Sequence, residues 1–249
     1  MKLDVTGMRV VVAGGSRGIG RSIALAFAEG GAAVSICARH PEALEAARAD
    51  IAAHGGTAHA APCDLSSLAE IERYIPAAAA ALGGIDVLVN NATGFGGGDD
   101  EASWDASLDV DLRAVVRASH AALPWLKQSG RASIVNIASG SGIGPSVRTP
   151  AYGAAKAAVI HYTRTQAASL IRSGIRANCV APGSIEFAGG VWDRRRRNEP
   201  ELYARTLANM PNGRMGLPEE VASVVLFLAS SLANWVTAQI ISVNGGQGL

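Results

Sequence analysis

Near the N-terminus a short apolar segment runs directly into a cluster of glycines, and this junction limits the folds open to the chain. Residues 8–13 form a β-branched run of the kind that is buried in parallel sheets. The glycine-rich segment 14–20 follows, and the alanine-rich stretch 21–29 has helical periodicity. A strand, glycine turn and helix in this order point backbone N–H groups and the positive helix end at phosphate. The spacing is G-x-x-x-G-x-G rather than G-x-G-x-x-G, so a tight turn without a ligand is the alternative; its place at the first strand favours phosphate binding.

Further apolar segments alternate with helical stretches along the rest of the chain. They predict strands at residues 8–13, 33–38, 57–61, 85–90, 132–138, 175–181 and 238–243. Such alternation is typical of an α/β fold, here a doubly wound parallel sheet of about seven strands with helices on both faces. Gly14, Asn90, Ser139 and Pro182 each follow a predicted strand. Because parallel strands end at one edge of the sheet, we expect these residues to gather there.

Composition and charge exclude several classes of function. The net charge of +1 gives no overall bias toward nucleic acid. No apolar run approaches the ~18 residues of a membrane span, and the first residues lack the apolar core of a signal peptide, so a cytoplasmic protein without membrane contact is expected. Cys37, Cys63 and Cys179 lack metal-ligand spacing, so no metal site is predicted. No linker divides the chain, and residues 1–249 are predicted to form one domain.

Tyr152 and Lys156 are the strongest candidates for chemistry. Residues i and i+4 of a helix share one face, so the ammonium can sit beneath the phenol and favour its ionised form. An unperturbed tyrosine has a pKa of about 10, so a tyrosine that exchanges protons near neutrality needs such a cation. Ser139, at the end of a predicted strand, offers a hydroxyl to orient a substrate oxygen. Most Tyr-x-x-x-Lys pairs on helices are accidental, so the surrounding motifs must decide.

Those motifs occur in an order that resembles the short-chain dehydrogenase/reductase family, with similarity to its 3-oxoacyl-ACP reductase-like members. The resemblance rests on the glycine turn, Asn90-Asn-Ala92 after a strand, Ser139, Tyr152-Gly-Ala-Ala-Lys156 and Pro182-Gly183. The 13 positions from Ser139 to Tyr152 match the family's active-site spacing. The resemblance covers essentially the whole chain, and it implies a Rossmann fold with a nicotinamide cofactor.

The resemblance also implies catalytic roles. Tyr152 would protonate the carbonyl oxygen during hydride transfer, Ser139 would bind that oxygen, and Lys156 would lower the tyrosine pKa and contact the nicotinamide ribose. Asp111 stands where the family usually carries an asparagine that supports a water relay to the lysine. Asp111 is therefore placed in the catalytic set. Its backbone carbonyl can hold the relay water, whereas loss of an amide donor would slow proton exchange.

The end of the second predicted strand bears on the choice of cofactor. An NAD-selective enzyme is expected to offer an acidic side chain to the ribose 2′-hydroxyl there. Residues 37–40 include none, and Arg39 lies among them. Arg17 lies within the glycine turn, and two guanidiniums suit a 2′-phosphate. We therefore predict NADP(H), with NAD(H) as the less favoured cofactor and two ordinary solvated arginines as the structural alternative.

Further cofactor contacts are implied by the family alone. Asp64 would contact the adenine, Asn90 would line the cleft and Ile185 would lie near the nicotinamide carboxamide. Thr93 stands where the family has glycine, and Phe187 where it commonly has a threonine. The full predicted cofactor set is Gly14, Ser16, Arg17, Gly18, Ile19, Gly20, Arg39, Asp64, Leu65, Asn90, Ala92, Tyr152, Lys156, Pro182, Gly183 and Ile185.

Residues 184–216 leave the strand–helix rhythm, and by resemblance they form the substrate loop and lid. Phe187, Trp192 and Tyr203 could line a pocket for a ring or an acyl chain. The arginine run 194–197 is interpreted first as a solvated helix face; the alternative is a dock for the phosphopantetheine arm of an acyl carrier protein or for coenzyme A.

The predicted function is NADP(H)-dependent interconversion of a small-molecule carbonyl and a secondary alcohol, with a 3-oxoacyl thioester or a cyclic ketone as candidate substrates. The alternative is a silent NADP(H)-binding sensor or scaffold, which Asp111 keeps open. Segment 94–98 is predicted to be a mobile loop at the pocket rim. Helices near 101–129 and 150–173 have alanine-rich faces that the family uses for subunit contacts, so a homotetramer or homodimer is expected.

Overall fold

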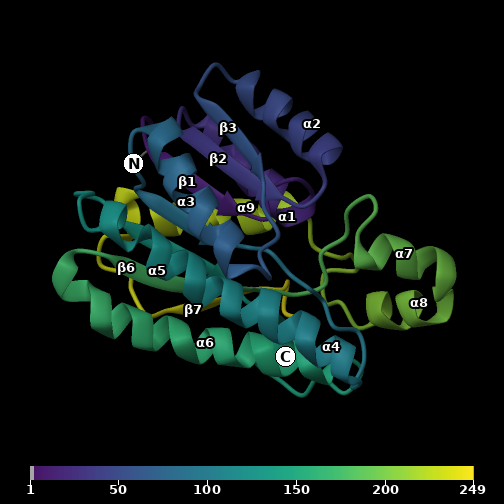
Figure 1. Ribbon diagram of the computed structural model, residues 1–249. Helices are drawn as coiled ribbons and strands as arrows, with labels where there is room; N and C mark the ends of the chain where they lie inside the picture. Colours follow the sequence, from purple (N-terminus) through teal and green to yellow (C-terminus); the bar gives the residue numbers. More distant parts are fainter. Residues whose placement is uncertain (1–2, 249) are drawn as a thin grey trace.

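A parallel β-sheet organises the computed structural model, which describes residues 3–248 (Figure 1). The sheet has seven strands in the order β3-β2-β1-β4-β5-β6-β7, all parallel. The strands are β1 (Arg9–Ala13), β2 (Ala33–Ala38), β3 (Ala58–Pro62), β4 (Val87–Asn90), β5 (Ser133–Ile137), β6 (Arg176–Pro182) and β7 (Ile240–Val243). Each coincides with a predicted strand to within two residues at either end. The doubly wound fold class is therefore confirmed.

Helices cover both faces of the sheet (Figure 1). One layer contains α1 (Gly18–Glu29), α2 (Pro41–Ala52) and α9 (Pro218–Ala229), with α1 packed along α9. The other contains α3 (Leu68–Leu82), α5 (Ala114–Leu126) and α6 (Pro150–Leu170). The strand order reverses between β1 and β4, and ligands of such sheets bind beyond the strand ends at that point.

The side chains of β1 show why this run forms a central strand. Val10 and Val12 belong to the hydrophobic core beneath α1 and α9, whereas Val11 and Ala13 belong to the core beneath α3 and α5. Successive residues of a strand point to opposite faces, so a strand buried on both faces must be apolar throughout. The uninterrupted apolar run read from the sequence follows directly from this double burial.

The helix predicted near residues 101–129 is one continuous helical segment of three parts. It begins with α4 (Glu101–Ala106), passes through the π-helical turn η1 (Ser107–Arg113) and continues as α5. The helix predicted near 150–173 is α6 followed by the 3₁₀ turn η3 (Ile171–Ser173). Asp111 lies inside η1, and π-helical turns of this kind are frequent at functional sites.

Residues 184–216 form an excursion whose two ends are hydrogen-bonded to each other. Gly216 N donates to Ser184 O at 2.9 Å, and Glu186 N donates to Gly216 O at 2.9 Å. Between these ends lie α7 (Val191–Asn198) and α8 (Pro200–Ala208), which stand apart from the sheet in Figure 1. Two short 3₁₀ turns elsewhere are η2 (Gly140–Gly142) and η4 (Ser231–Ala233). Within residues 3–248 no helix has the length and apolar character needed to cross a lipid bilayer.

Candidate active site

A large cavity opens along the carboxyl edge of the sheet, where the predicted motifs were expected to meet. Its volume is about 1510 Å³, and it extends from the glycine turn after β1 to helices α7 and α8. The predicted site residues that line it are Gly14, Ser16, Arg17, Ile19, Gly20, Arg39, Asp64, Leu65, Ala92, Ser139, Tyr152, Lys156, Pro182, Gly183 and Ile185. Gly18, Asn90 and Asp111 of the predicted set are not in its wall; each is described below.

The glycine turn is held tightly against the neighbouring strands. Gly14 N and Gly15 N both donate to Cys37 O at 3.1 Å, and Asn91 Nδ2 donates to Gly14 O at 2.7 Å. Gly14 has a φ of +89°, and a β-carbon there would lie 2.8 Å from Ala92 Cα. Only glycine satisfies both conditions. Asn91, which sequence reasoning did not single out, anchors the turn to the strand β4 region.

Helix α1 starts from this turn with a free positive end. The side chain of its N-cap residue, Arg17, makes no capping hydrogen bond, and none of the described residues in its first turn is acidic. The first N–H groups of a helix have no intrahelical partner, and together with the helix dipole they bind anions. Since this end opens onto the cavity, the residues present fit the phosphates of a dinucleotide.

Gly18 lies beneath the ring of Phe187 rather than in the cavity wall. It has a φ of +53°, and a β-carbon at this position would overlap that ring. Phe187 also lines the cavity. The aromatic side chain at the start of the substrate segment therefore packs directly on the start of α1, a contact that requires glycine.

The end of the cavity beside the carboxyl ends of β1, β2 and β3 is bordered by Arg17, Arg39 and Asp64. Asp64 Oδ1 accepts hydrogen bonds from Ser66 N at 2.9 Å and Ser66 Oγ at 2.8 Å. These bonds, with a smaller contribution from the charge of Arg39, hold the pKa of Asp64 below its ordinary value. Asp64 is thus a fixed carboxylate acceptor at the position where an adenine contact was predicted.

Asn90 is buried in a polar network between β4, β5, α5 and α6. Its Nδ2 donates to Asn136 Oδ1 at 2.8 Å and to Ser119 Oγ at 3.1 Å, and Asn136 Nδ2 donates to Thr163 Oγ1 at 2.9 Å. Asn90 was predicted to line the cofactor cleft; these bonds turn its side chain into the core, and the residue is not in the wall of the large cavity. Asn90 supports the floor of the site instead.

Tyr152, Ser139 and Lys156 meet at the middle of the cavity. Lys156 Nζ lies 5.6 Å from the centroid of the Tyr152 ring and donates to Ile137 O at 2.9 Å. Ser139 Oγ accepts a hydrogen bond from Ser141 N at 3.1 Å, and as a hydroxyl it can also donate one. The three side chains that sequence reasoning grouped by spacing are therefore brought together.

Asp111 lies behind this group and contacts the lysine. Its Oδ1 is 3.0 Å from Lys156 Nζ, and the two side chains are 0% and 2% exposed. Its Oδ2 accepts from Gly94 N at 3.1 Å and Phe95 N at 3.3 Å. The aspartate is a partner of the ammonium and an anchor for the loop after β4, a pair of roles that spacing alone did not reveal.

The protonation of Tyr152 reflects these neighbours. Burial raises the pKa of Tyr152 above its ordinary value; the charge of Lys156 and a hydrogen bond with Ser139 lower it, and the charge of Asp111 raises it. The predicted direction of the lysine effect is confirmed. The expected net lowering is wrong for this structure, because burial and Asp111 outweigh the lysine.

Phe95 belongs to the segment predicted at the pocket rim, but sequence reasoning did not foresee its contact with Tyr152. Its ring packs on Tyr152 with centroids 5.0 Å apart, and its φ of +45° is uncommon for a residue with a side chain. The surrounding loop is tightly packed: Gly96 N donates to Ser107 Oγ at 3.1 Å, and β-carbons at Gly94 and Gly96 would overlap the carbonyls of α4. The loop is thus anchored at Gly94 and Gly96, and Asp111 accepts hydrogen bonds from its first residues; its mobility stays a prediction.

Comparisons with known proteins identify the family. The family described as Enoyl-(Acyl carrier protein) reductase matches residues 13–247. The chain is 35% identical over 242 residues to 2-(S)-hydroxypropyl-CoM dehydrogenase 3 of Xanthobacter autotrophicus, covering 95% of each chain. It is 34% identical to the rhamnolipid-biosynthesis 3-oxoacyl-acyl-carrier-protein reductase of Pseudomonas aeruginosa over 252 residues, covering 98% and 97%.

The chain belongs to the short-chain dehydrogenase/reductase family. A solved structure agrees: 7α-hydroxysteroid dehydrogenase, in complex with NADH and 7-oxoglycochenodeoxycholic acid, superposes with a TM-score of 0.92 at 31% identity, covering 98% and 96% of the two chains. The Escherichia coli protein of that name is 31% identical over 248 residues. Membership makes this chain an oxidoreductase of carbonyl and alcohol groups that uses a nicotinamide cofactor.

Proposed function

We propose that this short-chain dehydrogenase/reductase interconverts a ketone and a secondary alcohol with NADP(H) and uses Tyr152 as the proton donor and acceptor. The observation that carries the proposal is the meeting of Tyr152, Ser139 and Lys156 in the wall of the same cavity that holds the phosphate-binding turn. A 3-oxoacyl thioester or a cyclic ketone is the candidate substrate.

The roles proposed for the residues are those that the family resemblance implies, and the geometry supports them. The bound nicotinamide supplies or accepts the hydride. Ser139 Oγ accepts from Ser141 N through one of its two lone pairs, and its O–H is the group that donates a hydrogen bond to the substrate oxygen. Tyr152 transfers its proton to the same oxygen during reduction and takes it back during oxidation. Lys156 stays charged. Burial lowers its pKa, but Asp111 and Tyr152 together raise it by more than burial lowers it.

Two arginines support NADP(H) over NAD(H). Arg17 and Arg39 border the adenosine end of the cavity, and a guanidinium binds phosphate with two parallel hydrogen bonds. Residues 37–40 include no carboxylate that would bind a ribose 2′-hydroxyl. We therefore expect NADP(H) to bind more tightly than NAD(H), because its 2′-phosphate can accept hydrogen bonds from these two guanidiniums.

A silent NADP(H)-binding sensor or scaffold is the second candidate. The observation in its favour is the ion pair between Asp111 and Lys156, which partly neutralises the charge that acts on Tyr152. The presence of all three proposed catalytic residues, Ser139, Tyr152 and Lys156, favours the enzyme over the sensor.

Cofactor binding and turnover separate the candidates. The protein is titrated with NADPH and NADH by fluorescence, and NADPH oxidation is then followed with an acetoacetyl thioester, a cyclic ketone and a quinone. If the protein is the proposed enzyme, we expect turnover with a preference for NADPH. Tight NADPH binding without turnover, also with secondary alcohols and NADP⁺, would favour the sensor.

Three further expectations belong to this proposal. Residues 1–249 act as one domain, the protein is cytoplasmic, and the faces of α5 and α6 carry the contacts of a homotetramer or homodimer. Analytical ultracentrifugation measures whether the protein is a homotetramer or a homodimer.

A further inference from the structure

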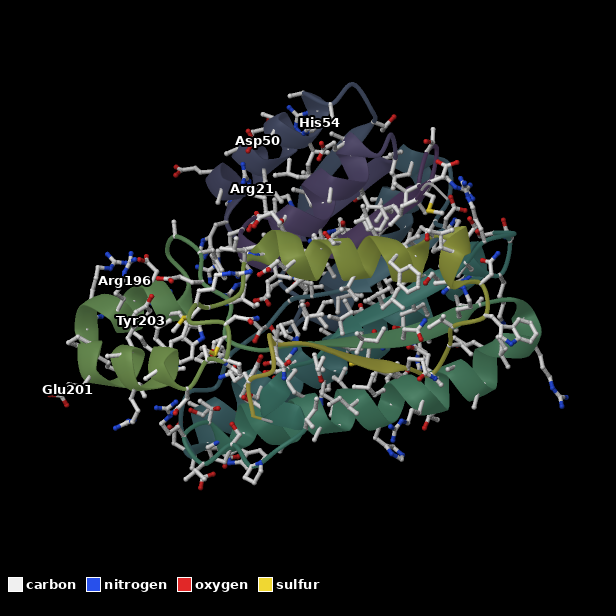
Figure 2. The ribbon with its side chains drawn as sticks, turned by 180° about the vertical axis from the view of Figure 1, so that it is seen from behind. Arg21, Asp50, His54, Arg196, Glu201 and Tyr203 are labelled. Carbon is white, nitrogen blue, oxygen red and sulfur yellow. The ribbon has the colours of Figure 1, made fainter. Side chains whose placement is uncertain are left out.

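The arginine run 194–197 is divided by the structure into an outer and an inner pair. Arg197 Nη2 lies 2.8 Å from Asp193 Oδ2, and Arg196 pairs with Asp193 at 3.1 Å and with Glu186 at 3.4 Å. Figure 2 shows Arg196 on the outer side of α7, at the end of the molecule away from the sheet. This outer pair is neutralised by carboxylates, as a solvated helix face would be.

The inner pair borders the cavity together with two arginines from other segments. Arg194 and Arg195 line the cavity from α7, Arg205 from α8, and Arg148 from the loop before α6. We call these four residues the arginine rim. Three separate segments supply these arginines. Their meeting at one cavity therefore cannot be explained by the sequence run 194–197 alone.

The charge of the arginine rim is scarcely compensated. Within the described residues 3–248, Arg148, Arg194 and Arg205 have no carboxylate within ion-pair distance, and Arg195 has only Glu199 at 3.8 Å. Burial, and then the positive charge of Arg148, lower the pKa of Arg195; Arg194 contributes in the same direction. Guanidiniums that are close enough to repel one another favour an anion between them.

Arg195 is also held in place before any ligand binds. Its guanidinium stacks over the Trp192 ring, with Cζ 4.9 Å from the centroid, and its side chain is only 17% exposed. Its neighbour Arg194 donates from Nη1 to Gly189 O at 2.7 Å. A pre-positioned guanidinium loses little freedom on binding an anion, which favours affinity and selectivity.

We propose that the arginine rim is an anion subsite for the end of the substrate remote from the reacting carbonyl. The substrate is then a ketone or secondary alcohol that carries a phosphate or a carboxylate, with its carbonyl at Tyr152 and its anionic group at α7 and α8. This inference rests on the proposed function for the position of the carbonyl, and it adds the chemical class of the substrate.

Matched pairs of substrates that differ in whether they carry the anionic group test the subsite. The phosphate pair is acetoacetyl-4′-phosphopantetheine and acetoacetyl-pantetheine; the carboxylate pair is 4-oxopentanoate and its methyl ester. We expect kcat/KM with NADPH to be about tenfold or more higher for the charged member of one pair, since charge-assisted hydrogen bonds to arginine are strong. The pair that shows the difference identifies the anionic group.

Variants place the effect at the arginine rim. Arg195→Gln and Arg148→Gln should each remove most of the difference in kcat/KM between the charged and the neutral member of that pair. Arg197→Gln is the matched control, because it lies in the same run but pairs with Asp193, and it should keep the preference. Arg148 is exposed, so its replacement should not disturb folding. Equal kcat/KM within both pairs, or a preference that survives both rim variants, would overturn the proposal.

A binding measurement keeps the test independent of turnover. Calorimetric titration with 4′-phosphopantetheine and with 4-oxopentanoate needs no reaction. Binding of either anion that weakens in Arg195→Gln but not in Arg197→Gln would support the subsite even if every ketone proved inert, in which case only the proposed catalysis fails. Binding of neither anion, or equal binding to both variants, would contradict the subsite even in an active reductase.

Discussion

At the scale of single residues, the ion pair between Asp111 and Lys156 matters most to the proposed chemistry. Both side chains are almost fully buried, so water does little to screen their interaction. Lys156 lowers the pKa of Tyr152 and Asp111 raises it. A carboxylate in place of the family's asparagine should therefore move the working range of the tyrosine to higher pH.

Asp111→Asn should shift the pH profile of alcohol oxidation to lower pH. Oxidation needs the ionised tyrosine, and removal of the carboxylate removes a contribution that raises its pKa. The asparagine oxygen can still accept the bonds from Gly94 N and Phe95 N, so the loop should remain in place. Lys156 loses its buried partner, which costs stability on the order of 3 kcal/mol. The measurement is kcat/KM against pH, with thermal unfolding beside it.

The matched control for this variant is Asp109→Asn. Asp109 lies in the same π-helical turn and also lines the cavity, but it pairs with Arg113 at 2.5 Å and not with Lys156. Its replacement should leave the pH profile unchanged. A profile in Asp111→Asn that stays at the wild-type pH, or moves to higher pH, would refute the tuning role of the aspartate.

Sequence reasoning reached some of these residues and not others, for physical reasons. Tyr152 and Lys156 follow from helical spacing, and Ser139 from its place at a strand end. The contact of Phe95 with Tyr152 was not foreseen because it joins a loop to a helix 57 positions away, and no periodicity encodes such a contact. The net pKa of Tyr152 was misjudged because burial cannot be read from a motif.

At the scale of elements, the junction of the glycine turn and the substrate segment is the most constrained contact of the site. Gly18→Ala would force a side chain into a left-handed conformation and against the Phe187 ring. We expect an affinity for NADPH at least about tenfold weaker, because the start of α1 must move. Fluorescence titration measures this.

Gly55→Ala is the matched control for that substitution. Gly55 also has a positive φ, +84°, but no atom lies within 4 Å of its would-be β-carbon. It should lose stability from backbone strain alone and keep full NADPH affinity. If both variants bind NADPH like the wild type, the turn at Gly18 is not part of the cofactor site.

Asp86 ties together the amino ends of β1, β4 and β5, opposite the active site. It accepts hydrogen bonds from Arg9 N and Arg9 Nε at 2.9 and 3.0 Å and from Ser129 Oγ at 2.6 Å. Burial alone would raise its pKa, but these bonds prevail and hold the pKa at about 2. A lowered carboxyl pKa stabilises the fold above the unfolded-state value near 4, and that contribution is lost as the pH falls from about 4 to about 2.

Asp86→Asn should therefore lower the free energy of unfolding at pH 7 by an amount on the order of 2 kcal/mol and flatten its fall between pH 4 and 2. Urea unfolding at several pH values measures both effects. Asp50→Asn is the control, because Asp50 pairs with Arg21 at the surface between α1 and α2 (Figure 2), and exposed pairs contribute little. Equal losses in the two variants would show that the buried cluster has no special role.

The elements were predictable to different degrees. Strand positions were predicted well because burial on both sheet faces demands apolar runs. The π-helical turn that holds Asp111 was not foreseen, since a slightly wider turn leaves the apolar periodicity nearly unchanged. Helix α7 was anticipated only as a helix face around the arginine run, and α8 was missed; both are short and mostly polar, and their segment was otherwise recognised only as a break in the pattern.

At the scale of the whole molecule, the sheet order determines where the site lies. The motifs come from strands spread over most of the chain, and the reversal of strand order between β1 and β4 brings them to one edge. This gathering was predictable from strand alternation alone. The cavity that links Tyr152 to the arginine rim was not, because it depends on how residues 184–216 pack over the sheet edge.

The most direct test of the proposed catalysis is the turnover of Tyr152→Phe beside its affinity for NADPH. The variant keeps the ring that packs on Phe95 but cannot donate a proton, so the fold and the cofactor site should persist. We predict nearly unchanged NADPH binding with kcat/KM for ketone reduction about 10²- to 10⁴-fold lower. Turnover at the wild-type rate would contradict the assignment of Tyr152 as the proton donor.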